Sequence, residues 1–245
     1  MENGRYSIGL IGLGVVGSAL YRWFEQNTKH KLKKYDPRLG YKESIYFCDF
    51  IFIQVPVPTK PDYSQDSSII EDVLQLCQIR QIKVIRSTVL PGTADRLKCF
   101  SMPEFLTERT AYEDFCKLPI ITGIPEEIPL SLLFPSKKII RTSNHEAELI
   151  KYTHNAFGAL KVNYFNHIFE YCRKNNLDYD VIRKNIQLTG FINDPHTMVP
   201  GPDGMFGFGG KCLPKDLDAF YGCTGIEIFR QTSEDNKKFR ERTMR

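Results

Sequence analysis

The feature that most constrains the fold is a GxGxxG pattern near the N-terminus, Gly12-Leu13-Gly14-Val15-Val16-Gly17. The apolar stretch Tyr6–Ile11 before it is typical of a strand, and Val15–Phe24 is typical of a helix. In such a unit the first glycine permits the tight turn, the second lets a pyrophosphate approach the backbone, and the third lets helix and strand pack closely. The phosphates would lie at the helix N-terminus, where free N–H groups and the helix dipole favour an anion.

Short apolar strands alternate with helical stretches over the first 140 residues. A helix is expected at Ser68–Ile79, and further strands are expected at Lys31–Tyr35, Phe50–Val55, Lys83–Ser87, Pro119–Thr122 and Lys138–Arg141. This alternation predicts an α/β domain, a Rossmann-like doubly wound parallel sheet with helices on both faces, over residues 1–142.

The pattern changes at Ser143, where Ser143-Asn144-His145-Glu146 forms a capping-box signature. Apolar residues then recur at helical spacing to about Asn175. We therefore expect residues 143–245 to form a smaller all-helical domain built on one long helix, which would also form a homodimer through residues 143–175. A shorter helix is expected at Asp178–Asn185 and a loop at Thr189–Gly210, and the basic tail Lys237–Arg242 is expected to lie on a solvated helix.

Composition narrows the function classes. The 245 residues carry a net charge of only +4 without a long basic tract, which argues against nucleic-acid binding. Seven cysteines without a CxxC pair suit a reducing compartment, and no segment is long enough to span a membrane. We expect a soluble cytoplasmic protein. No His/Cys cluster has the spacing of metal ligands, so no metal is predicted.

The cofactor is expected to be NAD. Asp36 lies nineteen residues beyond Gly17, where a carboxylate can bind the adenosine ribose hydroxyls and favours NAD over NADP; Arg38 would soften that preference. Val55 and Pro56 end a strand at the edge of the sheet where ligands bind in open α/β folds. The predicted cofactor-binding residues are Gly12, Gly14, Val15, Val16, Gly17, Asp36, Val55, Pro56, Thr88 and Lys215.

A second motif, Phe206-Gly207-Phe208-Gly209-Gly210-Lys211-Cys212-Leu213-Pro214-Lys215-Asp216, places a thiol after a glycine-rich loop. We interpret Cys212 as a nucleophile, because a thiolate adds to an aldehyde and the thiohemiacetal can then lose a hydride. Cations of Lys211, Lys215 or Lys151 would stabilise the thiolate. The other six cysteines are expected to be small buried hydrophobes: Cys48, Cys77, Cys99, Cys116, Cys172 and Cys223.

Charged and polar groups elsewhere complete the predicted chemistry. Lys151 and Asn155 are four residues apart, so they share a helix face and can stabilise an oxyanion. Asp216, with Thr88, can activate or orient a water for thioester hydrolysis. Glu104 and Glu108 are also four residues apart, and we expect one of them to serve in acid/base work during hydrolysis and the other to hold the substrate. The predicted catalytic residues are Cys212, Lys151, Asn155, Asp216, Thr88, Glu108 and Glu104.

With these motifs in order, the chain resembles the UDP-glucose/GDP-mannose dehydrogenase family from about residue 6 to 240. The resemblance rests on the N-terminal GxGxxG, Ser87–Thr93, Pro103–Glu108, Lys151 with Asn155–Phe157, and Gly207–Asp216. It implies oxidation of a sugar-nucleotide alcohol to a carboxylate with two NAD, through a cysteine thioester, most simply UDP-glucose to UDP-glucuronate. The expected substrate-binding residues are Phe105, Leu106, Glu104, Lys151, Asn155, Phe206, Phe208 and Gly209.

The sequence also departs from this family. The residues of this sequence end at Arg245, where the family's connecting helix would lead into a C-terminal domain that binds the nucleotide of the substrate, and we expect that domain to be lacking. The region between Asp36 and Phe50 is also short. Two alternatives therefore stay open. One is a non-catalytic NAD-binding or assembly module whose partner supplies the missing domain. The other is a two-electron dehydrogenase of the β-hydroxyacid type, against which Cys212 argues.

Overall fold

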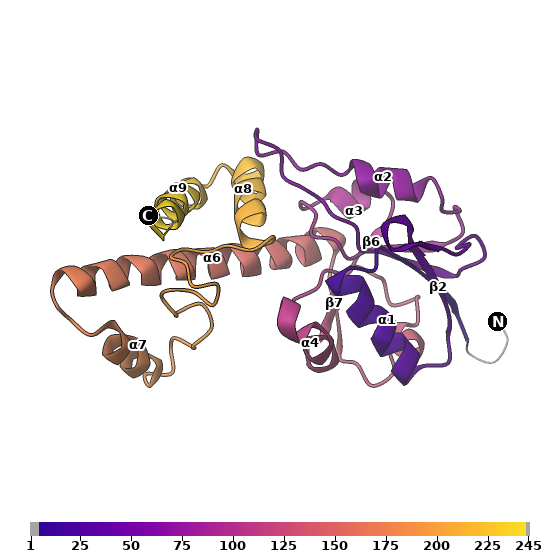
Figure 1. Cartoon of the computed structure of the whole chain (residues 1–245). Coiled ribbons are helices and arrows are strands. Elements are labelled where there is room, and N and C mark those ends of the chain that lie inside the picture. Colours follow the sequence, from indigo (N-terminus) through magenta and orange to yellow (C-terminus); the bar gives the residue numbers. More distant parts are fainter. Residues whose placement is uncertain (1–4, 244–245) are drawn as a thin grey trace. The chain divides into compact units, whose positions relative to one another are not determined.

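The computed structural model describes residues 5–243 and divides them into two compact units. The first unit contains the chain up to Pro58 together with Gln65–Lys151, and the second contains Thr59–Ser64 together with the chain from Tyr152 onward. One helix, α6 (Asn144–Lys174), begins in the first unit and continues through the second (Figure 1).

A six-stranded sheet organises the first unit. The strands are β1 (Ser7–Ile11), β2 (Lys31–Asp36), β3 (Tyr41–Lys42), β4 (Phe50–Ile53), β5 (Ile82–Ile85) and β6 (Phe100–Ser101), in the spatial order β3-β2-β1-β4-β5-β6. All neighbours are parallel except β2 and β3. A separate parallel pair joins β7 (Ile120–Thr122) to β8 (Ile139–Arg141). The predicted Rossmann-like parallel sheet is confirmed.

Helices cover both faces of this sheet (Figure 1). Alternation along the strands explains why: Leu10 and Phe52 face one apolar cluster, whereas Ile11 and Ile53 face the other. The first cluster packs against α1 (Val15–Asn27), α4 (Ala111–Lys117) and α5 (Leu130–Leu133), and the second against α2 (Ser68–Leu74) and α3 (Thr93–Arg96). Short 3-10 helices lie at η1 (Pro37–Leu39) and η2 (Glu108–Thr110).

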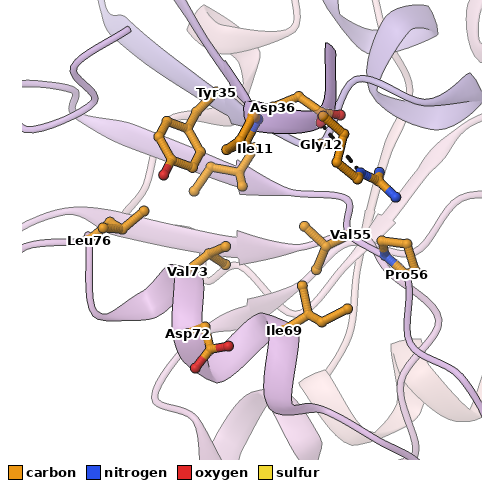
Figure 2. A pocket seen from close by; sticks show the side chains of 12 residues that line it. Ile11, Gly12, Tyr35, Asp36, Val55, Pro56, Ile69, Asp72, Val73 and Leu76 are labelled. Atoms are coloured by element: carbon orange, nitrogen blue, oxygen red, sulfur yellow. Dashed lines mark ion pairs between the residues drawn. The ribbon is translucent and has the colours of Figure 1, made fainter. Parts of the chain in front are cut away.

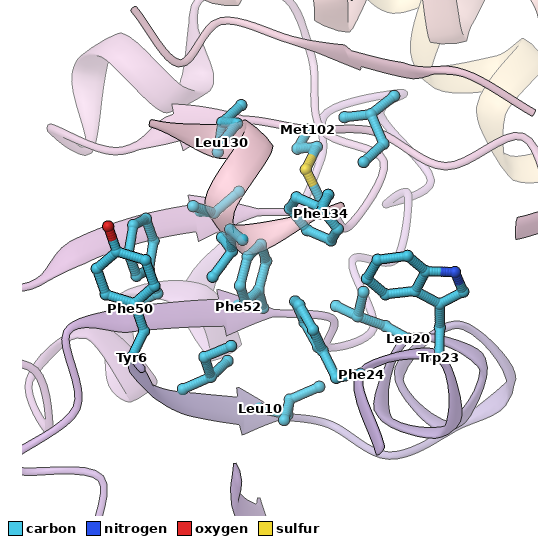
Figure 3. Close-up of a cluster of buried hydrophobic side chains, with 14 of the residues drawn as sticks. Tyr6, Leu10, Leu20, Trp23, Phe24, Phe50, Phe52, Met102, Leu130 and Phe134 are labelled. Carbon is cyan, nitrogen blue, oxygen red and sulfur yellow. The ribbon is translucent and has the colours of Figure 1, made fainter. Parts of the chain in front are cut away.

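Aromatic rings fill the cluster that packs against α1 (Figure 3). Phe134 is fully buried, and its ring centroid lies 5.0 Å from that of Phe24 and 5.5 Å from that of Trp23. Truncating a ring in such a cluster costs about 3–5 kcal/mol, because the neighbours cannot close the cavity. The face of the sheet opposite α2 is therefore covered by a closely packed apolar cluster.

The second unit is built on α6, with α7 (Tyr179–Gln187), α8 (Leu213–Thr224) and α9 (Glu227–Thr243). The predicted capping box is present at the start of α6: the Ser143 N–H donates to Glu146 Oε2 at 2.9 Å, and the Glu146 N–H donates to Ser143 Oγ at 3.1 Å. Thr189–Gly210 has neither helix nor strand, as expected. Within residues 5–243 no helix is both long and apolar enough to cross a membrane.

Several helix and strand boundaries differ from the sequence expectation, and two of them have a physical reason in the fold. Helix α2 ends at Leu74 rather than Ile79, because turns follow it and Ile79 is almost fully exposed. The strand expected to extend to Val55 ends at Ile53, and the remaining residues leave the sheet to form the rim of a pocket.

Candidate active site

A pocket of about 390 Å³ lies at the carboxyl edge of the sheet in the first unit (Figure 2). Figure 2 shows Ile11 and Tyr35 on one side of it and Ile69 and Val73 of α2 on the other, with Val55, two residues beyond the end of β4, between them. Gly12, Asp36 and Pro56 also line it. Four of the predicted cofactor-binding residues thus surround one largely apolar pocket, of the kind that accepts a flat ring system.

The three glycines of the fingerprint meet three different surroundings. A Cβ at Gly12, which has φ +83°, would lie 2.5 Å from the Gln54 carbonyl oxygen, and one at Gly17 would lie 2.0 Å from the Gly12 carbonyl oxygen. A Cβ at Gly14 would meet nothing within 4 Å. The first and third glycines are therefore required by the packing of the protein itself. The second leaves open space at the N-terminus of α1, where a pyrophosphate is expected.

Asp36 is the last residue of β2 and is almost fully buried. Its Oδ2 accepts a hydrogen bond from the Leu13 N–H at 2.8 Å, and its Oδ1 lies 3.6 Å from Nε of the exposed Arg38. The carboxylate thereby ties the glycine loop to the second strand. Arg38 stands beside the acid, as its spacing in the sequence suggested.

Glu104 and Lys151 form a buried ion pair in the first unit. Their Oε1 and Nζ atoms are 3.2 Å apart, and the side chains are 11% and 6% exposed. Glu104 Oε2 also accepts a hydrogen bond from the Leu106 N–H at 2.6 Å, and Lys151 Nζ lies 5.4 Å from the centre of the Phe105 ring. Both charges are too deeply buried to be solvated surface groups, which favours a functional assignment.

Arg86 is a further buried cation that the sequence interpretation missed. It follows β5 and lies with Glu104 around a cavity of about 20 Å³, room for about one water molecule. Among the described residues, no hydrogen-bond partner meets its Nε and Nη1. Burial lowers the pKa of Arg86 to about 10, while the charge of Glu104 acts in the opposite direction. The only signal in the sequence was a charged residue at the end of an apolar strand.

Thr88 lies in the loop after β5, and that loop is held in several places. The Gln65 side chain donates to the Thr88 carbonyl at 3.0 Å and accepts from the Leu90 N–H at 2.9 Å. Glu148 on α6 accepts from the N–H groups of Gly92 and Ala94, at the start of α3. Glu148 precedes Lys151 by three residues, but in sequence it resembled any solvated glutamate.

In the second unit, the predicted nucleophile occupies the N-cap position of α8. Cys212 is exposed there, and its carbonyl accepts the Asp216 N–H at 2.9 Å in the first turn of the helix. Pro214 stands in that first turn, where its missing N–H costs no helix hydrogen bond. A thiol at a helix N-terminus lies where the dipole favours its thiolate.

Asp216 is almost completely buried, and its carboxylate is engaged on both sides. Oδ2 accepts a hydrogen bond from Asn155 Nδ2 at 2.6 Å, and Oδ1 pairs with Lys215 Nζ. The Thr59 hydroxyl donates to the Lys215 carbonyl at 2.8 Å. Asn155 and Asp216 were assigned separately from the sequence, and the structure brings them into direct contact.

Several predicted residues have plainer surroundings. Glu108 begins η2 and is exposed, in contrast to the buried Glu104. Val15 is exposed and Val16 half-buried at the start of α1. Phe208 is buried, and the Phe206 ring packs against Phe169, with their centroids 5.5 Å apart.

The expectation for the other cysteines was wrong in two cases. Cys48, Cys99 and Cys172 are buried, but Cys116 and Cys223 are exposed. Cys116 lies on the outer side of α4, and Cys223 stands near the C-terminal end of α8. Burial raises the pKa of both Cys77 and Cys99 to about 11, so these two thiols are poor nucleophiles.

Family models match both parts of the chain. The NAD binding domain of the UDP-glucose/GDP-mannose dehydrogenase family matches residues 20–129, and the central domain of the same family matches residues 145–227. The chain belongs to this family. Its cofactor is accordingly NAD, and the open backbone at Gly14 and the pocket beside Asp36 fit that cofactor.

Curated relatives include nucleotide-sugar dehydrogenases of different substrates. The chain is 30% identical to a UDP-glucose 6-dehydrogenase of Rickettsia bellii, over 84% of this chain and 51% of that protein. It is 33% identical to a GDP-mannose 6-dehydrogenase of Pseudomonas aeruginosa, over 77% of this chain and 50% of that protein. The chain spans about half the length of these relatives.

Solved structures agree on the fold. A UDP-glucose dehydrogenase from Pyrobaculum islandicum superposes with a TM-score of 0.78 at 22% identity, covering 98% of this chain and 69% of that one. A 3-hydroxyisobutyrate dehydrogenase of Mycobacterium tuberculosis superposes with a TM-score of 0.74 at 18% identity, covering 96% of this chain and 94% of that one.

Among the described residues, no group of His, Cys, Asp and Glu is arranged to hold a metal ion.

Proposed function

We propose that this chain carries the NAD-binding and catalytic parts of a nucleotide-sugar dehydrogenase that oxidises a sugar-nucleotide alcohol to a carboxylate. UDP-glucose, giving UDP-glucuronate, is the substrate proposed first. The assignment of residues 1–142 to the NAD-binding domain and 143–245 to the helical domain is part of this proposal. So is a cytoplasmic location.

The observation that carries the proposal is the start of α8. An exposed thiol at a helix N-terminus is followed one turn later by a buried carboxylate that is hydrogen-bonded to Asn155. A structural cysteine needs no such neighbour, whereas a nucleophile that must form and then release an acyl group needs a polar group near it.

The proposed chemistry has two oxidation steps, and NAD, when bound, supplies the hydride acceptor. At the aldehyde level the Cys212 thiolate adds to the carbonyl carbon, forming a C–S bond and an oxyanion. We assign stabilisation of that oxyanion to Lys151 and Asn155, which supply a cation and an amide donor. Loss of the second hydride leaves a thioester.

Hydrolysis then completes the reaction. The oxygen of a water molecule attacks the acyl carbon, the C–S bond breaks, and the thiol of Cys212 is restored. We assign orientation of the water to Asp216 and Thr88, and acid/base work to Glu104. Glu108, which is exposed, is assigned to holding the substrate.

The stoichiometry tests this proposal. UDP-glucose, GDP-mannose and UDP-N-acetylhexosamines would each be supplied with NAD or NADP, and we expect two NADH for each sugar nucleotide oxidised. Cys212→Ser is expected to abolish acid production. Cys223→Ser is the matched control, because Cys223 is an exposed cysteine on the same helix. Full acid production by Cys212→Ser would refute the thioester route.

A two-electron dehydrogenase is the second candidate, favoured by the superposition of the 3-hydroxyisobutyrate dehydrogenase over nearly its whole length. It would give one NADH per substrate and would tolerate Cys212→Ser. A third possibility, a module that binds NAD without turnover, would show NAD binding by calorimetry and no NADH with any substrate of the panel.

We also propose a homodimer formed through the long helix. Phe157, Tyr164 and Tyr171 on α6 are each seven residues apart and 64%, 57% and 61% exposed. Seven-residue spacing places them along one side of the helix. An exposed aromatic row of this kind is typical of a protein–protein contact.

A further inference from the structure

Helix α9 holds the glycine-rich segment that precedes Cys212. The Asn236 side chain makes two hydrogen bonds to the backbone of one residue: its Oδ1 accepts from the Phe208 N–H at 2.7 Å, and its Nδ2 donates to the Phe208 carbonyl at 2.9 Å. Asn236 and Phe208 are both buried. One amide group thus satisfies both backbone groups of Phe208, as a neighbouring strand would.

Close approach of the backbone explains two of the glycines. A Cβ at Gly207, which has φ +71°, would lie 2.3 Å from Asn236 Oδ1. A Cβ at Gly209 would lie 2.3 Å from Nη2 of Arg240, one turn further along α9. The backbone of this segment therefore lies directly against α9 at Gly207 and at Gly209. A side chain at either position would push the segment away from the helix.

Other contacts hold the same segment from different directions. Asn166 on α6 accepts the Gly207 N–H at 2.9 Å, and Arg240 pairs with Asp203 at 2.7 Å. Thr189–Gly210 lacks helix and strand, so side chains rather than a sheet or helix fix its course. Only three residues separate Phe208 from Cys212, so a displacement at Phe208 reaches the thiol within about 14 Å of chain.

We propose that Asn236 is a positioning residue that keeps Cys212 at the N-terminus of α8. This role rests on the proposed function of Cys212 as the nucleophile. It also extends the functional part of the chain beyond residue 227, where the match to the family's central domain ends. Asn236 acts through the backbone of Phe208, so it need not touch the substrate.

The test measures the reactivity of the thiol and needs neither substrate nor cofactor. Asn236→Ala, Asn236→Asp and Lys237→Ala would each be made in the full chain. Lys237 is the matched control, since it is the exposed neighbour of Asn236 on α9. Iodoacetamide labelling is followed by peptide mass spectrometry, with the exposed Cys116 and Cys223 as internal references.

In Asn236→Ala we expect Cys212 to be alkylated about threefold more slowly at neutral pH, because a loosened loop takes the thiolate away from the helix terminus. The pH profile of its alkylation should move to higher pH. Asn236→Asp keeps the acceptor for the Phe208 N–H and loses the donor to its carbonyl, so a smaller effect is expected. Cys116 and Cys223 should react at unchanged rates in every variant.

The proposal would be overturned if Cys212 were alkylated at the same rate in Asn236→Asp as in Lys237→Ala, while Asn236→Ala either also reacted at that rate or was shown by circular dichroism to be unfolded. So would a parallel change at all three cysteines, which would indicate general loosening. Slower alkylation in an enzyme that produces no NADH would support the positioning role and reject the dehydrogenase. Two NADH per substrate, with Cys212 alkylated at an unchanged rate in the Asn236 variants, would support the dehydrogenase and reject the positioning role.

Discussion

At the scale of single residues, the glycines of the fingerprint have different roles: Gly17 is required for the packing of the protein, whereas Gly14 leaves space for the cofactor. Gly14→Ala adds a methyl group to open space at a residue with φ −67°, which any residue adopts. We expect this variant to fold with little loss of stability and to bind NAD at least tenfold more weakly, because the methyl group occupies the approach of the pyrophosphate.

Gly17→Ala is the matched comparison, since the same methyl group would lie 2.0 Å from the Gly12 carbonyl oxygen. Helix α1 must then move away from β1, and we expect a loss of about 1–3 kcal/mol in the free energy of unfolding. Urea unfolding and NAD titration of both variants provide the measurement. Equal NAD affinity of Gly14→Ala and the unmodified chain would contradict the predicted phosphate site.

The sequence could propose individual site residues but not the residues that they contact. Spacing could place Lys151 and Asn155 on one helix face, because four residues make about one turn. Lys151, however, pairs with Glu104, which is 47 residues away in the chain. Asn155 donates a hydrogen bond to Asp216, which is 61 residues away. Asn236 was missed because a polar residue in a basic amphipathic tail resembles a solvated one until the loop that it binds is known.

At the scale of secondary-structure elements, the length of each element decided what could be predicted. The 31-residue α6 carries a long periodic pattern and a capping box, and the strand–turn–helix around Gly12 carries the glycine fingerprint; both were found. Strands β3 and β6 have two residues each, and helices α3 and α5 have four. So few residues show no periodicity, and their conformation is set by neighbours in the fold.

The short helix α3 depends on Glu148, and this gives a pH-dependent prediction. Burial raises the pKa of Glu148 to about 7, although hydrogen bonds from the N–H groups of Ala94 and Gly92 favour its charged form; nearby Asp95 acts in the same direction as burial. The folded state therefore holds this proton more tightly than the unfolded state, whose pKa is near 4.5. Its contribution to stability is complete below pH 4.5 and is lost as the pH rises through about 7.

Glu148→Gln removes the titration and keeps an oxygen acceptor for one of the two N–H groups. We expect the decline in the free energy of unfolding between pH 5 and pH 8 to become shallower in this variant. Urea unfolding at several pH values measures it, with Glu146→Gln as the control for a glutamate whose pKa is instead lowered to about 2, mainly by the Thr142 hydroxyl. The same slope in Glu148→Gln and the unmodified chain would contradict the assignment.

At the scale of the whole molecule, the remaining prediction concerns association of two chains through α6. A helix that buries apolar residues on its inner side has no need of an aromatic row on its outer side unless something covers it. Replacing Phe157, Tyr164 and Tyr171 together by serine removes most of that apolar surface without touching Lys151 or Asn155. Tyr46 and Phe47 are also exposed but lie outside any helix or strand, so their serine variants are the control.

Light scattering over a range of protein concentrations distinguishes the single chain from the homodimer by mass. We expect the unmodified chain and the Tyr46/Phe47 control to have twice the chain mass of 28.3 kDa, and the α6 triple variant to have 28.3 kDa. Circular dichroism would show that the triple variant keeps its helices, because the three side chains are mainly exposed and contribute little to folding. A 28.3 kDa mass for the unmodified chain at every concentration, or a persistent dimer in the triple variant, would show that the aromatic row has another role.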